Sequence, residues 1–118
     1  MRIYNRKDFL NLPPDTIFCK GTEWCFENLC RKEESIENDF FYQELCDIDC
    51  TNSEDRDEKF EDALKNATSL EINRCNSRDG MFDDDAVFLV FEKKDLLYLY
   101  EVIIKCVVKS VLTNEIQD

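Results

Sequence analysis

The longest hydrophobic pattern of the chain lies in its C-terminal third. Ala86 to Phe91 is a run of six apolar residues without polar alternation. Such a run predicts a strand at the centre of a sheet or covered on both faces, and its Val and Phe content favours strand over helix. Glu92 follows, with Asp95 three residues on, and both acids suit the positive end of a helix. We therefore expect a central strand joined by a tight junction to a long helix.

This C-terminal helix is predicted over about Lys93 to Leu112, and it is apolar over more than half of its circumference. Its polar positions form one stripe with i,i+4 spacing: Glu101, Lys105 and Lys109. A helix this apolar packs in the core or pairs with a second copy of the chain. We expect packing across the sheet, and a homodimer through this helix is the alternative. Thr113 to Asp118 is expected to fray.

Shorter elements separated by turn signals make up the rest of the chain. The patterns predict two helices, Asn5–Leu12 capped by Asn5 and Ser53–Ala67 capped by Ser53, and four strands, Thr16–Lys20, Trp24–Arg31, Asp39–Cys50 and an edge strand Leu70–Cys75. The segments 32–38 and 76–85 read as surface loops. The order favours an α+β fold in one domain, residues 1–118. It has a mainly antiparallel sheet of four to five strands, with the long C-terminal helix and the shorter acidic helix packed on one face.

Charge narrows the range of partners. The 118 residues carry a net charge of −12, while 43% of them are hydrophobic, enough for a real core. Nucleic acids and anionic membranes would be repelled, whereas a basic protein surface would be attracted. An acidic balance also serves simple solubility, which is the alternative explanation.

The cysteine count and the lack of a leader pattern indicate a cytoplasmic protein. Seven cysteines cannot all pair within one chain. Met1 to Leu12 has no apolar signal-peptide core, and the apolar run Val102 to Leu112 is too short for a membrane span. We therefore expect free thiols in a reducing compartment.

The absent residue types exclude most familiar enzyme classes. The chain has no histidine and only two glycines, Gly21 and Gly80. Histidine-based triads, the helical two-histidine zinc motif and glycine-rich phosphate loops cannot be formed. We expect a protein that is not an enzyme and needs no cofactor.

Two metal sites are the remaining chemical alternatives. Four cysteines could hold zinc, since four residues separate Cys25 from Cys30 and three separate Cys46 from Cys50. Asp79 with Asp83, Asp84 and Asp85 could bind Mg²⁺ or Ca²⁺ for a metal-dependent reaction. Buried apolar cysteines and a solvated loop explain the same residues without a metal.

The acidic face of the second helix is the stronger candidate for function. Its carboxylates are Asp57, Glu58, Glu61 and Asp62. Carboxylates spaced along a helix can imitate a row of phosphates and occupy a basic nucleic-acid channel, although an ordinary solvated face has the same pattern. Asp83, Asp84 and Asp85 form a second acidic patch. We expect both patches to bind the partner.

Three segments carry a resemblance to a known group of proteins. Tyr4–Pro13, Asn38–Tyr42 and Arg78–Ala86 together resemble short uncharacterised proteins encoded by bacteriophages and prophages. Small acidic proteins of this kind include inhibitors of bacterial defence such as anti-CRISPR proteins. The resemblance implies an inhibitor that occupies a basic, nucleic-acid-binding surface of a host defence complex without catalysis. An immunity protein or antitoxin that neutralises a toxin nuclease is the alternative.

Overall fold

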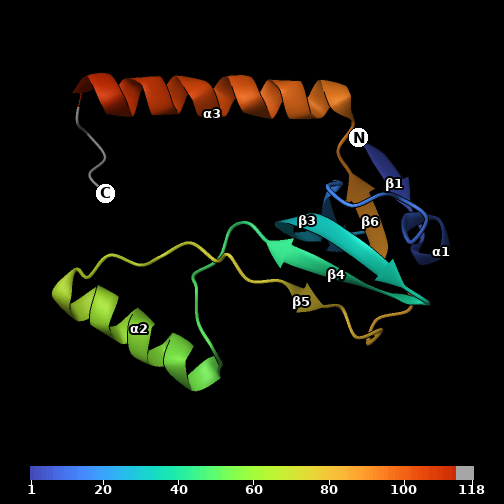
Figure 1. Ribbon diagram of the computed structural model, residues 1–118, viewed down its shortest axis with the longest axis horizontal. Coiled ribbons are helices and arrows are strands. Elements are labelled where there is room, and N and C mark those ends of the chain that lie inside the picture. Colours follow the sequence, from blue (N-terminus) through green and yellow to red (C-terminus); the bar gives the residue numbers. More distant parts are fainter. Residues whose placement is uncertain (114–118) are drawn as a thin grey trace.

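The computed structural model describes residues 1–113, which form one antiparallel sheet and three helices (Figure 1). The sheet order is β1-β6-β2-β3-β4-β5. The strands are β1 (Arg2–Tyr4), β2 (Ile17–Gly21), β3 (Phe26–Ile36), β4 (Asp39–Glu44), β5 (Ser77–Arg78) and β6 (Val87–Val90), and the helices are α1 (Arg6–Phe9), α2 (Ser53–Asn66) and α3 (Lys93–Thr113). The predicted α+β class with an antiparallel sheet is confirmed, with six strands instead of four to five.

Strand β6 is an interior strand, as its apolar sequence predicts. It pairs with β1 on one side and with β2 on the other. Phe88 and Val90 are buried, whereas Val87 and Leu89, on the opposite face, are only half-buried. Because both edges of β6 are paired, this difference means that one face of the sheet is closed and the other is open.

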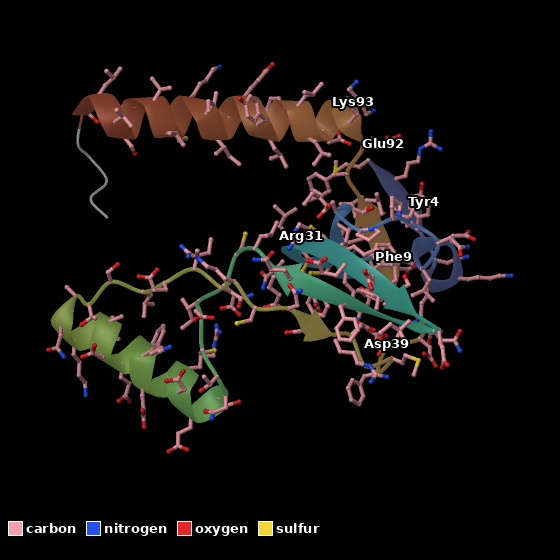
Figure 2. The ribbon with its side chains drawn as sticks, viewed as in Figure 1. Tyr4, Phe9, Arg31, Asp39, Glu92 and Lys93 are labelled. Carbon is pink, nitrogen blue, oxygen red and sulfur yellow. The ribbon has the colours of Figure 1, made fainter. Side chains whose placement is uncertain are left out.

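The closed face is covered by α1 through a cluster of four phenylalanines. The ring of Phe9 stacks on Phe88 with centroids 4.0 Å apart and meets Phe18 and Phe40 edge-on at 4.7 and 5.1 Å. Figure 2 places Phe9 between α1 and the sheet. The helix is shorter than the predicted Asn5–Leu12, but Asn5 caps it as expected, accepting a hydrogen bond from the Asp8 amide at 2.8 Å.

The charged segment 32–38 is not the predicted loop, because β3 continues through Ile36. This charged part of β3 pairs with β4 at Lys32, Ser35 and Ile36, whereas the pairing with β2 ends at Arg31. The β4 ladder therefore gives its backbone hydrogen-bond partners along one edge despite its charge. The buried Lys32 ammonium donates to the Ser35 hydroxyl at 2.9 Å and to the Glu33 carbonyl at 3.0 Å. The chain then turns at Glu37, which has a φ of 55°.

The edge of the sheet also differs from the prediction. Strand β4 ends at Glu44, short of the expected Cys50, and beyond it only an isolated bridge joins Ile48 to Ile72. The edge strand is β5, inside the segment expected to be a loop, and it pairs Arg78 with Phe41 of β4.

The two longer helices form where predicted but do not pack on the sheet. Asn52, not Ser53, caps α2, accepting from the Asp55 amide at 2.8 Å. At the start of α3 the Asp95 carboxylate accepts from the Glu92 amide at 2.8 Å, which matches the expected arrangement of the two acids. No residue of either helix is buried within the described chain. The expected packing of both helices on one face is therefore wrong.

Both helices lie beside the sheet in Figure 1. Within residues 1–113 no helix has the combined length and apolar character that a membrane crossing requires. The expected fraying after Thr113 concerns residues 114–118, which lie outside the described part.

Candidate partner-binding surface

Helix α2 is tied to the connecting segment before it through its own cations. Arg56 Nη1 lies 2.7 Å from Asp47 Oδ1. Lys59 Nζ lies 3.2 Å from Asp55 Oδ2 and donates to the Asp49 carbonyl at 2.9 Å. Arg56 and Lys59, two of the three cationic side chains of α2, therefore contact groups on one side of the helix. The opposite side consists mainly of carboxylates.

The four predicted carboxylates Asp57, Glu58, Glu61 and Asp62 are all exposed. Among the residues that the structure describes, none of the four forms a salt bridge. Asp62 Oδ1 accepts a hydrogen bond from the side-chain amide of Asn66 at 2.7 Å, and this bond lowers the pKa of Asp62. The Asp62 carboxylate is therefore ionised at neutral pH, and its exposed side chain is accessible to an external cation.

Two large apolar side chains of the same helix are exposed, although the predicted packing of this helix on the sheet would cover its apolar side. Phe60 is 60% exposed and Leu64 is 75% exposed. Asp57, Phe60, Glu61 and Leu64 have the spacing i, i+3, i+4, i+7, so they share one side of the helix. We call this surface, together with Glu58 and Asp62, the α2 face. The sequence predicted the charges of this face, but not the exposure of Phe60 and Leu64, because the helix was expected to pack on the sheet.

The second acidic patch does not join the α2 face. Asp83, Asp84 and Asp85 are exposed in the loop between β5 and β6. In Figure 1 this loop and α2 lie at different ends of the molecule. The two predicted patches are therefore separate surfaces, and one small partner surface cannot contact both.

Asp79 differs from these three exposed aspartates in its burial and in its contacts. Its side chain is 4% exposed, with Arg6 Nη1 at 2.8 Å from Oδ2 and Lys20 Nζ at 3.0 Å from Oδ1. Burial works to raise the pKa of Asp79, but the hydrogen bonds from Arg6 and Lys20 outweigh it and hold the pKa below its usual value. Asp79 is a structural ion-pair partner, and the alternative four-aspartate metal site is not assembled within residues 1–113.

The adjacent Asp39 completes this ionic network. Its buried carboxylate is 2.5 Å from Arg78 Nε and accepts from the Gly80 amide at 3.1 Å. Gly80 has a φ of 85°, which favours glycine at this turn. Together, Asp39 and Asp79 fasten the β5–β6 loop to the closed face of the sheet.

The cysteine site is not assembled either. The thiols of Cys25, Cys30, Cys46 and Cys50 are free, and Cys30 is buried while Cys25 is exposed. Within residues 1–113 no group of three or more Cys, Asp or Glu side chains is arranged to hold a metal ion.

A small cavity lies beside the ionic network. It has a volume of about 100 Å³ and is lined by residues that include Cys30, Tyr42 and Asp79. Burial raises the pKa of both the Cys30 thiol and the Tyr42 hydroxyl to about 12, so neither group is ionised at neutral pH. Ligand pockets typically have volumes of about 300–1,000 Å³. The cavity is therefore too small for a typical substrate and lacks an activated nucleophile.

Comparison of the chain with protein-family models, with curated proteins and with solved structures gives no match.

Proposed function

We propose that this protein is a non-catalytic interaction module whose α2 face binds a basic protein surface. The observation that carries the proposal is the α2 face itself, where Asp57 and Glu61 flank the exposed Phe60 and Leu64 and Glu58 and Asp62 extend the acidic surface around the helix. None of the four carboxylates forms a salt bridge within the described residues. Binding energy in protein interfaces is concentrated in buried apolar and aromatic anchors, while surrounding charges set specificity and association rate. The α2 face has both features on a single helix.

The binding mode is an amphipathic helix laid into a groove. Phe60 and Leu64 enter an apolar groove on the partner, and the carboxylates contact Lys or Arg side chains at its rim. Asp57 and Glu61 are one helical repeat apart, about 6 Å along the axis. Such a row of negative charges engages cations that otherwise bind phosphates.

The resemblance to phage-encoded proteins supports a more specific assignment. We propose that the partner is a nucleic-acid-binding surface of a host defence complex in the host cytoplasm, which the protein inhibits by occupying it in a fixed stoichiometry. The net charge of −12 favours such a partner over nucleic acid itself.

Capture from host lysate tests the proposal. The tagged protein is compared with a variant that reverses Asp57, Glu58, Glu61 and Asp62 to Lys, and bound proteins are identified by mass spectrometry. We expect the wild type to retain a basic protein that the variant loses, with binding weakened as NaCl rises from about 50 to 500 mM. The identity of the captured protein then separates a defence complex from a toxin nuclease.

Two further variants distinguish binding by the α2 face from a general effect of negative charge on binding. Reversing Asp83, Asp84 and Asp85 to Lys changes a comparable charge on the other patch and should leave capture unchanged. Phe60→Ser keeps every charge and should weaken the purified complex at least tenfold, measured by calorimetry. Equal affinity of the wild type and the α2 charge variant at low salt would remove the proposal.

A further inference from the structure

The open face of the sheet carries an apolar row that no helix of the described chain covers. Strand pairing aligns Ile3 with Leu89, Leu89 with Cys19, and Cys19 with Leu29, so the row crosses β1, β6, β2 and β3. Residues directly opposite each other in an antiparallel pair point to the same side. Ile3 is 64% exposed, and Leu89 and Leu29 remain half-buried although their strands are interior, whereas Cys19 in the same row is buried.

Helix α3 is a second uncovered apolar surface on the same chain. Eleven of its large apolar side chains are between 37% and 78% exposed, among them Leu97, Ile103 and Val107. The free energy of burying such a side chain, divided by the transfer free energy per unit area, corresponds to roughly 60–120 Å² of apolar surface. With about half of it exposed, α3 leaves on the order of 500 Å² of apolar surface in water, near the upper limit for a free monomer.

The chain junction directs α3 away from its own open face. The Glu92 carboxylate lies 2.9 Å from Arg2 Nε of β1, and the Glu92 amide donates to Asp95 at 2.8 Å. Figure 2 shows Glu92 and Lys93 at this junction, and in Figure 1 α3 extends past the sheet without crossing it. Covering its own sheet would require α3 to break these contacts and fold back, whereas a second molecule can approach without that change.

The net charges of α3 and of the rest of the chain indicate which surface covers α3 and which covers the open sheet face. Helix α3 has four lysines against two acids, a net charge of +2, whereas residues 1–92 have 11 basic and 23 acidic residues, a net charge of −12. Two α3 helices would repel each other, but α3 and the body of another copy attract. The acidic body is also unsuited to an anionic lipid surface.

We propose that two copies of this chain form a twofold dimer in which α3 of each copy lies on the open sheet face of the other. The exchange buries two helices and two sheet faces, in total on the order of 1,500 Å², which is the size of a specific interface. Pairing of α3 with α3 would leave both sheet faces in water. The dimer also presents two copies of the α2 face, which raises the avidity for a partner with two basic sites.

Complementation between two variants tests this arrangement by sedimentation velocity at micromolar concentration. One variant carries Ile103→Lys and Val107→Lys on α3, and the other carries Ile3→Lys and Leu29→Lys on the open face. Glu101→Lys, on the polar stripe of α3, is the control. We expect the wild type and the control to be dimers. Each double variant alone should be monomeric, with a dissociation constant raised at least about 100-fold.

An equal mixture of the two double variants should dimerise again, because one intact helix then meets one intact sheet face. If circular dichroism shows that the open-face variant is unfolded, Ile3→Lys alone replaces it, because that side chain is 64% exposed. A monomeric wild type, an open-face variant that still dimerises, or a mixture that stays monomeric would each overturn the proposal. A monomeric wild type that sediments with neutral phosphatidylcholine vesicles would assign α3 to a lipid surface instead.

Discussion

Replacing Asp79 by Asn tests whether the ionic network stabilises the fold. Asn keeps the shape of the side chain but removes the charge that Arg6 and Lys20 contact at 2.8 and 3.0 Å. Arg6 keeps a hydrogen bond to the Asn38 carbonyl at 2.9 Å, whereas Lys20 loses its carboxylate partner.

The magnitude follows from how deeply the charges are buried. Breaking a fully buried ion pair costs about 3–5 kcal/mol, because it leaves an uncompensated charge. The side chain of Lys20 is 21% exposed and can turn to water, while that of Arg6 is 11% exposed but retains Asn38. We therefore expect Asp79→Asn to lower the free energy of unfolding by about 2–3 kcal/mol, below the fully buried value.

Urea unfolding measured by NMR on amides of β2 and β6 provides the assay, since it reports on the sheet and not on the exposed helices. Asp84→Asn is the matched control, because Asp84 is exposed in the same loop. The control should change stability by less than about 0.5 kcal/mol. Equal stabilities of the Asp79 and Asp84 variants would refute the structural role of the network.

The effect of Asp79→Asn on the free energy of unfolding should also depend on pH. The pKa of Asp79 is lowered from 3.8, so its stabilising contribution is present above pH 3.8 and is lost as the pH falls through the lower pKa of the folded state. The difference between wild type and Asp79→Asn should therefore be largest near neutral pH and shrink below pH 3.8. A difference that grows on acidification would contradict this assignment.

Two further predictions concern the closed face. Phe9→Leu keeps an apolar side chain but removes the ring contacts to Phe18, Phe40 and Phe88, each worth about 0.5–1.5 kcal/mol beyond burial, so urea unfolding should show a loss of about 2–4 kcal/mol. A loss under 1 kcal/mol would mean that α1 is not the cover of the core. Burial raises the pKa of Cys30 from 9.0 to about 12, so the unfolded chain ionises first and wild-type stability should fall by about 1.4 kcal/mol per pH unit above pH 9 from this group. Cys30→Ala, compared with wild type under reducing conditions at pH 7.5 and pH 10, should lose less stability; equal losses would contradict the burial of the thiol.

Local patterns in the sequence determined the elements whose formation depends on neighbouring residues. The apolar run before Glu92 specified β6, and the broad apolar pattern after it specified α3 almost to the residue. Asn5 caps α1, as its position before the helix predicts. The acids of α2 are exposed carboxylates, as their spacing along the helix predicts. In each case the deciding interaction lies within about one helical turn or between adjacent strand residues, so the sequence alone contains it.

Tertiary structure decided the environment of residues that look alike locally. Asp79 and Asp84 belong to one loop, yet only Asp79 is buried, because Arg6 and Lys20, 73 and 59 positions away, meet it there. The charged half of β3 became a strand because β4 pairs with it at Lys32, Ser35 and Ile36. Periodicity placed Phe60 and Leu64 on one side of α2, but it could not determine whether another surface would cover them, because that depends on contacts between segments distant in the chain.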